Sequence, residues 1–172
     1  MSDYWLCAYS PSESFDRLME FLTERGRFIR TENYETHELT PDGKLCIEKY
    51  DGYSKVLMKH GSSLSVHDET EIRCRESDFE NLLSLFSSLG YFPLTVWKIN
   101  RHLFDWEQCM VYVDKIDDFG IVVRLKLYAQ LKRKEDAVAE AEKMFGKLGL
   151  QIVDKEDFDQ KIMTYRSNKS EH

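Results

Sequence analysis

The chain has few cysteines and no long apolar run, and each shortage excludes a class of protein. Its cysteines lie far apart and form no paired motif, which predicts reduced thiols in a cytoplasmic protein and not a disulfide framework. They are Cys7, Cys46, Cys74 and Cys109. No apolar stretch is long enough to span a bilayer. No glycine-rich phosphate loop and no serine or cysteine nucleophile motif stands out.

The chain also lacks an excess of positive charge. Its formal net charge is -7 at pH 7, which argues against broad binding to nucleic acid or to anionic membranes. Charged residues make up 32% of the composition, with both signs interspersed, as on a solvated surface. A length of 172 residues is that of one domain, residues 1–172, with a real hydrophobic core.

What is present is organised around one stretch, residues 67–92. Its first half alternates as a strand does, with Glu69, Glu71 and Arg73 on one face. The other face of this predicted strand carries Thr70, Ile72 and Cys74. The second half switches to helical spacing, and its apolar stripe consists of Phe79, Leu82, Leu83 and Phe86. The stretch therefore predicts a strand with a charged face that runs into an amphipathic helix.

The same unit occurs earlier in the chain. Residues 15–28, FDRLMEFLTERGRF, align without a gap to residues 79–92, FENLLSLFSSLGYF, and match Gly26 with Gly90. A two-copy repeat predicts an internal pseudo-two-fold domain. Its halves would span about residues 4–60 and 67–130, followed by helices over about 134–165. The alternative is that two amphipathic helices ending at glycine simply look alike.

Alternation and turn signals supply the other elements. Hairpins are predicted about Asp51-Gly52 and about residues 117–120, and residues 31–42 form a polar stretch without a strand signal. The predicted strands cover residues 4–10, 44–50, 54–59, 67–75, 96–105, 110–115 and 120–130. The total is about eight strands and four helices. The predicted fold class is therefore α+β with a mostly antiparallel sheet.

Charges recur at strand spacing in both halves. In residues 120–127, four apolar residues alternate with Val122, Arg124 and Lys126, so one face would pack on helices and the other would gather charge. Eight such strands, closed or nearly closed into a barrel, would enclose a polar lumen. Lysine and arginine in that lumen would attract a phosphorylated anion through charge-assisted hydrogen bonds. The alternative is an open sheet with its charged face in water.

The order of these features resembles the CYTH family, the triphosphate tunnel enzymes that include thiamine triphosphatases, inorganic triphosphatases and one class of adenylate cyclase. The stretch HDETEI at residues 67–72 is similar to the family's Glu-x-Glu strand, and VYVDKIDDFGIVV at residues 111–123 resembles its Asp-to-Gly signature. Three shorter matches lie along the chain in the same order as in the family: LCIEK, VLMK and KINRHLF. The resemblance covers roughly residues 4–163.

The resemblance implies an eight-stranded tunnel in which basic side chains hold a triphosphate and carboxylates hold Mg²⁺ or Mn²⁺. The implied phosphate contacts are Lys59, Arg73, Lys98 and Arg101, with Arg124 and Lys126 added from the last hairpin. The implied metal ligands are Glu69, Glu71 and Asp114.

The chain departs from the family pattern in its acidic residues. Where the family's first strand carries Glu-x-Glu-x-Lys, the repeat places Trp5, Cys7 and Tyr9, and Arg124 and Lys126 replace an acidic pair on the last strand. The leading hypothesis is therefore a divergent protein, monomer or homodimer, that binds a small phosphorylated ligand, with a doubtful metal site and weakened or lost hydrolysis. One alternative is an active metal-dependent triphosphatase or cyclase-like enzyme in which Glu48 joins the other carboxylates. The other alternative is a non-catalytic protein-interaction module.

Overall fold

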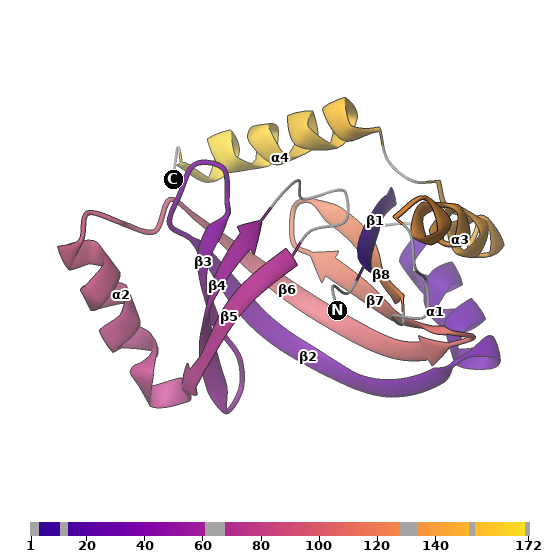
Figure 1. Ribbon diagram of the computed structural model, residues 1–172, viewed down its shortest axis with the longest axis horizontal. Coiled ribbons are helices and arrows are strands. Elements are labelled where there is room, and N and C mark those ends of the chain that lie inside the picture. Colours follow the sequence, from indigo (N-terminus) through magenta and orange to yellow (C-terminus); the bar gives the residue numbers. More distant parts are fainter. Residues whose placement is uncertain (1–3, 11–13, 61–67, 128–133, 152–153, 171–172) are drawn as a thin grey trace.

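The computed structural model describes residues 4–10, 14–60, 68–127, 134–151 and 154–170. Within them, eight antiparallel strands form one sheet with four α-helices (Figure 1), which confirms the predicted α+β class. The strands are β1 (Tyr4–Ser10), β2 (Arg27–Glu38), β3 (Leu45–Lys49), β4 (Tyr53–His60), β5 (Asp68–Arg75), β6 (Thr95–Trp106), β7 (Cys109–Ile116) and β8 (Gly120–Leu127). The helices are α1 (Phe15–Arg25), α2 (Phe79–Ser88), α3 (Lys134–Lys147) and α4 (Lys155–Ser170), and a 3₁₀ turn (Glu76–Asp78) precedes α2.

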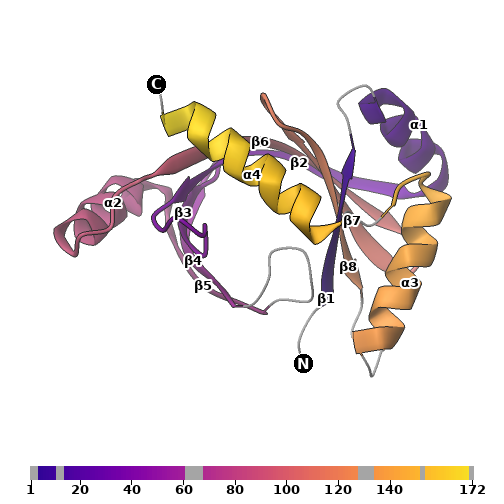
Figure 2. The same cartoon turned by 90° about the horizontal axis from the view of Figure 1, so that it is seen from above.

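The sheet is curved and open. Its strands lie in the order β1-β8-β7-β6-β2-β3-β4-β5, so β1 and β5 are the two edges. Figure 2 shows the sheet wrapping around a concave side, with α4 across it. Between the described residues, β1 pairs with β8 and β5 pairs with β4, and no ladder joins β1 to β5. The predicted closed barrel is therefore not confirmed, and the described sheet is a nearly encircling but open one.

The two halves of the chain have the same order of elements. A strand, a helix and three strands, β1 to β4, are followed by a second such set, β5 to β8. Counted inward from one edge of the sheet, the strands are β1, β8, β7 and β6. Counted inward from the other edge, they are β5, β4, β3 and β2, so the two sets occupy equivalent places. The sets meet where β2 pairs with β6, and there the Asn100 amide donates to the Asn33 side-chain oxygen directly opposite, at 2.7 Å. This arrangement agrees with the pseudo-two-fold repeat, whose predicted limits at residues 67 and 130 lie outside the described residues.

Strand β2 corrects the prediction of a polar stretch over residues 31–42. It is twelve residues long, and its polar residues fall on both faces, so its sequence lacks the alternation of a half-buried strand. One face points into the polar concave side and the other remains partly in water. Its strand conformation comes from pairing, with β6 on one side and β3 on the other. Tertiary pairing here overrides local propensity.

The hydrophobic core lies on the convex side of the sheet, under the helices. In β8, Ile121, Val123, Leu125 and Leu127 are buried against α1 and α3, which confirms the predicted apolar face of this strand. Helix α2 packs separately on β3 through Phe79 and Ile47. Helix α4 packs on the concave side, where Tyr165 stacks on Trp97 at a centroid distance of 4.1 Å. Among the described helices, none has the length and apolar content needed to cross a membrane.

Candidate anion-binding cavity

The concave side of the sheet and α4 enclose a cavity of about 980 Å³. Because side chains alternate along a strand, every second residue of β2, β4, β6 and β8 points into it. Helix α4 contributes the side chains at one end, including Phe158 and Arg166. The cavity is the concave site that the strand alternation predicts.

Most of the predicted site residues meet in this cavity. Lys59 of β4, Arg101 of β6, and Arg124 and Lys126 of β8 all line it. The acidic residues Glu69 and Glu71 of β5 line it as well. Asp114 of β7 lies directly behind the lining, fully buried, in contact with two of these arginines.

Two predicted phosphate contacts lie elsewhere. Lys98 is three residues from Arg101, so strand alternation turns it to the opposite face, where it is exposed beside a separate shallow hollow. Arg73 is exposed near the C-terminal end of β5, and its guanidinium carbon lies 3.8 Å from the centroid of the Tyr53 ring. The prediction that Lys98 faces the cavity is thus corrected by the strand register, and Arg73 sits on one of the lining tyrosines without lining the cavity itself.

Asp114 holds two arginines in place. Arg101 donates two hydrogen bonds to its carboxylate, Nε to Oδ1 at 2.7 Å and Nη2 to Oδ2 at 2.9 Å. Arg124 approaches the same carboxylate, with Nε 3.6 Å from Oδ2. A paired carboxylate with no exposed surface serves as a counter-ion that fixes both guanidinium groups. The predicted role of Asp114 as a metal ligand does not fit this arrangement.

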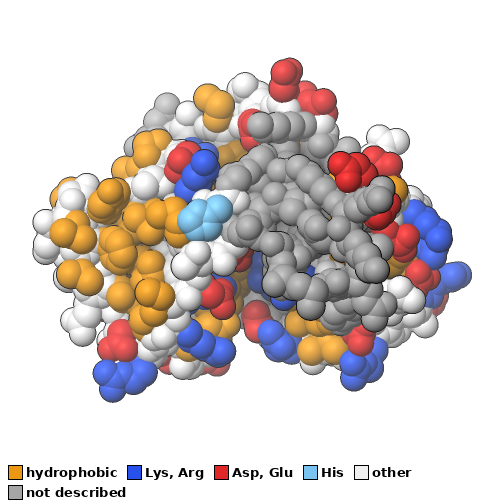
Figure 3. All heavy atoms as spheres, in the orientation of Figure 1, with side chains coloured by type: hydrophobic (Ala, Val, Ile, Leu, Met, Phe, Trp, Pro, Cys, Tyr) orange, Lys and Arg blue, Asp and Glu red, His pale blue; other side chains and the backbone are white. Residues whose placement is uncertain are grey.

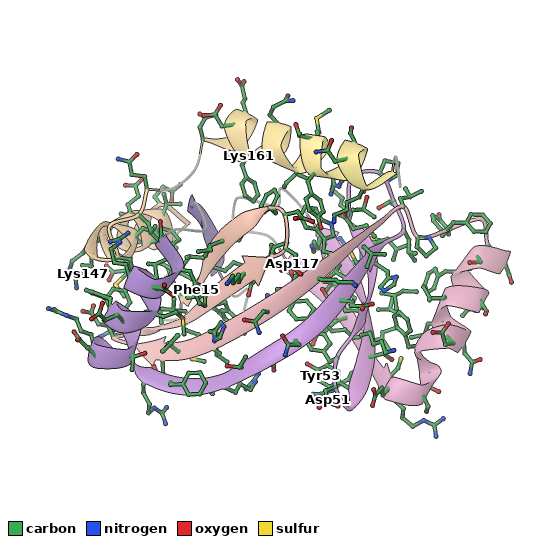
Figure 4. The ribbon with its side chains drawn as sticks, turned by 180° about the vertical axis from the view of Figure 1, so that it is seen from behind. Phe15, Asp51, Tyr53, Asp117, Lys147 and Lys161 are labelled. Atoms are coloured by element: carbon green, nitrogen blue, oxygen red, sulfur yellow. The ribbon has the colours of Figure 1, made fainter. Side chains whose placement is uncertain are left out.

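A stack of aromatic rings extends from Arg101 along the cavity wall. The Arg101 guanidinium lies between the rings of Tyr34 and Tyr112, at 4.9 and 4.8 Å from their centroids. Tyr34 stacks on Tyr50 at 4.5 Å, and Tyr50 stacks on Tyr53 at 4.4 Å, with interplanar angles of 10° and 7°. Tyr53 is the first residue of β4 and lies near Asp51 of the preceding hairpin turn (Figure 4). Burial raises the pKa of Tyr34 and Tyr50 well above the usual range, so both phenols stay neutral.

Lys55 bridges two carboxylates on the wall formed by β3, β4 and β5. Its Nζ lies 3.0 Å from Oε2 of Glu71 and 3.4 Å from Oε2 of Glu48. Burial disfavours the Lys55 charge, but the two glutamates outweigh it and raise the pKa of Lys55. Glu48 is buried and also accepts hydrogen bonds from the Thr36 and Tyr50 hydroxyls, at 3.1 and 2.8 Å. The lysine is therefore charged and held in a fixed place.

The lining as a whole is mixed in sign. The basic residues that line the cavity are Arg30, Lys44, Lys55, Lys59, Arg101, Arg124, Lys126 and Arg166. The acidic residues that line it are Glu32, Glu38, Asp42, Glu48, Glu69, Glu71 and Asp159. Much of the charge is thus balanced within the protein, whereas the sequence predicts a basic lumen. Ligand binding would have to draw on cations that already have acidic neighbours.

The described carboxylates do not fit a divalent-ion site. No three histidine, cysteine, aspartate or glutamate side chains converge to hold a metal in the part of the chain that the structure describes. Several cavity carboxylates already face cations of the chain: Asp114 faces Arg101, Glu48 and Glu71 face Lys55, and Glu38 faces Arg166. A magnesium or manganese site of the family type would need such oxygens to be available to the ion.

Sequence reasoning missed several residues of this cavity. Lys55 is four residues from Lys59, so both side chains lie on the same face of the strand. This alternation could have identified Lys55 from the sequence. Arg30 and Tyr34 belong to β2, which carries no strand signal. Arg166 lies just beyond the predicted helices, which end at about residue 165, whereas α4 continues to Ser170. No sequence pattern marked the tyrosine stack, because Tyr34, Tyr50 and Tyr53 come from β2, from the turn between β3 and β4, and from β4.

Comparisons with known proteins identify the fold. No family model matches the sequence, and no curated protein matches it. Among solved structures, the PH1819 protein of Pyrococcus horikoshii is similar with a TM-score of 0.71 and 19% identity, over 89% of this chain and 93% of that one. HpAC1 of Hippeastrum, a candidate adenylyl cyclase with a dominant triphosphatase activity, is similar with a TM-score of 0.66 and 15% identity, over 97% and 96%. A candidate adenylate cyclase of Vibrio parahaemolyticus is similar with a TM-score of 0.64 and 13% identity, over 88% and 91%. The chain therefore shares its fold with proteins of the adenylate cyclase and triphosphatase type.

Proposed function

We propose that this chain is a divergent CYTH-type protein whose cavity binds a triphosphate-like anion without hydrolysing it efficiently. The observation that carries the proposal is the convergence of Lys59, Arg101, Arg124 and Lys126, from three strands, on one cavity. A triphosphate group is an extended anion with many acceptor oxygens, which suits several cations spread along a wall. The fold shared with a protein of triphosphatase activity supports this ligand class.

The four cations would act in two ways. Arg101 and Arg124 are held by Asp114, so their guanidinium groups are positioned before the ligand arrives and lose little freedom on binding. Lys59 and Lys126, on β4 and β8, carry their charges on flexible four-carbon stems that would close on opposite ends of the anion. Since carboxylates of the cavity compete for the same cations, we expect modest affinity and a strong dependence on salt.

Weak hydrolysis follows from the same balance of charges. In the family, divalent ions polarise the phosphoryl group and orient the attacking water. The described carboxylates, engaged by Arg101, Lys55 and Arg166, give such an ion few free oxygens. We therefore expect direct binding of the anion by the protein's own cations.

A thermal-shift titration with sodium tripolyphosphate in metal-depleted buffer tests the proposal. Binding at one hundred times the Kd should stabilise the fold by about 2.7 kcal/mol and raise Tm by several degrees. Replacing Lys126 by Glu, alone and together with Arg124→Glu, should remove the shift, because it inverts the charge facing the anion. The single variant keeps the test usable if the double variant does not fold.

Lys98→Glu is the matched control. It makes the same change of charge on the same sheet, but on the opposite face. A shift that survives in Lys98→Glu and disappears in Lys126→Glu supports the cavity. A shift lost equally in both, or no shift in the unaltered protein, would refute it.

An active metal-dependent triphosphatase is the second candidate, and the triphosphatase activity of the Hippeastrum neighbour favours it. Release of phosphate from tripolyphosphate, thiamine triphosphate and ATP distinguishes the two, measured with and without Mg²⁺ or Mn²⁺. Rapid metal-dependent turnover that is lost in Glu69→Gln or Glu71→Gln would establish this alternative. Tight binding with negligible turnover supports the first proposal.

A further inference from the structure

Strand β5 is an exposed edge of the sheet. In the described chain it pairs with β4 on one side, and its residues from Thr70 to Arg73 are exposed. Ile72, at its middle, is 64% exposed. An edge strand with an exposed β-branched apolar residue is a template for pairing with another strand.

Charges on an edge usually prevent such pairing, but here their order favours it. Along one face the strand reads Glu69, Glu71, Arg73 and Arg75, with the two acids before the two bases. We propose that the chain forms a homodimer by antiparallel pairing of β5 with β5 of a second copy, about a two-fold axis at Ile72. In that register Glu71 faces Arg73 of the other copy and Glu69 faces Arg75, and symmetry repeats both pairs.

The charges select this register over its neighbours. A two-fold axis perpendicular to the sheet requires residues of the same face to meet, so the axis can shift only by whole residues. An axis at residue 71 would place Glu71 against Glu71, and an axis at residue 73 would place Arg73 against Arg73. Like charges directly opposite on a sheet are destabilising, whereas opposite charges stabilise it. The axis at Ile72 avoids both clashes and places the two exposed isoleucines side by side.

The contacts of Arg73 within the chain support the pairing. In the β4–β5 ladder Arg73 lies opposite Lys55, a like charge. Among the described residues, Arg73 contacts the face of the Tyr53 ring, and no carboxylate lies within salt-bridge distance of its guanidinium. Glu71 of a second copy would supply an acid on the other side. Glu71 also contacts Lys55 at 3.0 Å, so the pairing would place each Glu71 between two cations, Lys55 of its own chain and Arg73 of the second copy.

A second copy fits this edge better than β1 of the same chain. Strand β1 has the sequence YWLCAYS, without a charged residue, so closing the sheet would leave the four charges of β5 opposite uncharged residues. The two-fold axis also keeps both α2 helices on the same face of the joined sheet. Apolar side chains gather on the side of the molecule where α2 lies (Figure 3). Leu85 and Leu89 of α2 and Met58 of β4 are exposed. Of these residues Met58 would lie nearest the dimer axis, because it is opposite Thr70 on the strand next to β5.

Sedimentation equilibrium of the full chain over a range of concentrations tests the proposal. The unaltered protein should approach twice the mass of one chain. Arg73→Glu replaces two attractive pairs by two repulsive ones, and should raise the dimer dissociation constant about 10- to 100-fold. The double variant Glu71→Arg with Arg73→Glu restores opposite charges and should dimerise again, while Lys98→Glu should behave as the unaltered protein.

Covalent trapping tests the register without altering a charge. The proposed pairing places Thr70 directly opposite Cys74 of the second copy, so Thr70→Cys should form disulfide-linked dimers under mild oxidation. The variant Thr70→Cys with Cys74→Ser removes that partner and should remain uncross-linked. A single-chain mass at every concentration would overturn the proposal. So would a dimer that neither responds to Arg73→Glu nor cross-links through Thr70→Cys.

Discussion

Arg166 of α4 donates two hydrogen bonds to the carboxylate of Glu38 at the end of β2, from Nε at 2.9 Å and from Nη2 at 2.6 Å. Trp97 donates a third from its indole nitrogen at 2.6 Å. Glu38 is buried, so its charge depends on these partners. The contact joins residues 128 positions apart and ties α4 to the sheet over one end of the cavity.

Replacing Arg166 by Leu should lower the free energy of unfolding by about 2 to 4 kcal/mol, because it leaves a buried carboxylate without its cation. Urea denaturation followed by tryptophan fluorescence measures this loss. Glu38→Gln on the same background should cost less than it does in the unaltered protein, because the pair is already broken. Full additivity of the two losses would contradict the coupling of these residues.

Gly43 lies against the same ion pair with φ at +68°. A Cβ there would fall 2.3 Å from Nη2 of Arg166 and would collide with the Glu38 carboxylate. Gly43→Ala should therefore destabilise the fold by more than the roughly 1 to 3 kcal/mol of a left-handed non-glycine residue alone. Gly52→Ala is the matched control, because Gly52 has φ at +87° with open space around its Cβ position. Equal losses in the two variants would show that the ion pair adjusts freely.

Asp114→Asn should lower the free energy of unfolding by about 3 to 5 kcal/mol, because it removes the counter-ion of Arg101 and Arg124. The same change should increase the thermal shift caused by tripolyphosphate, because losing a competing negative charge beside the two guanidinium groups outweighs losing their fixed positions. Melting curves with and without the anion report both effects. If Asp114 served a metal instead, Asn would leave the tripolyphosphate shift in metal-depleted buffer unchanged.

The cysteines should differ in their reactivity. Burial raises the pKa of Cys46 and of Cys109 to about 12 in each case, so both thiols remain protonated at pH 8. Cys74 is partly exposed at the edge strand. Iodoacetamide at pH 8 should label Cys74 well before the other two, as peptide mass spectrometry would reveal. In urea the three should become equally reactive, and early labelling of Cys46 in the native protein would contradict its burial.

The sequence predicts those strands and helices that have one apolar face. Strand β8 is an example, because its apolar residues alternate with Arg124 and Lys126. Strand β2 could not be found this way, since both of its faces meet polar surroundings and its conformation depends on β6 and β3. The internal repeat contained the missing signal, since a strand after α2 implies a strand after α1.

The candidate site shows the same limit. Where the sequence reveals a strand and its alternation, it also predicts which side chains face the cavity. Lys59 and Lys126 are two examples. The sequence prediction for Lys98 is wrong, because Lys98 is three positions from Arg101 and therefore points to the opposite face of β6. The charge balance could not be predicted, since Arg166 meets Glu38 and Lys55 meets Glu48 only once the elements are packed.

The ladder between β2 and β6 joins the two halves of the sheet, and it has a register irregularity between Phe28 and Arg30. One wall of the cavity, with Lys59, belongs to the first half, and the other wall, with Lys126, belongs to the second. The twist of two paired strands therefore sets the separation of these ammonium groups. Substitutions far from any bound molecule, at the seam between the halves, would change how long a chain of phosphates the protein can accommodate.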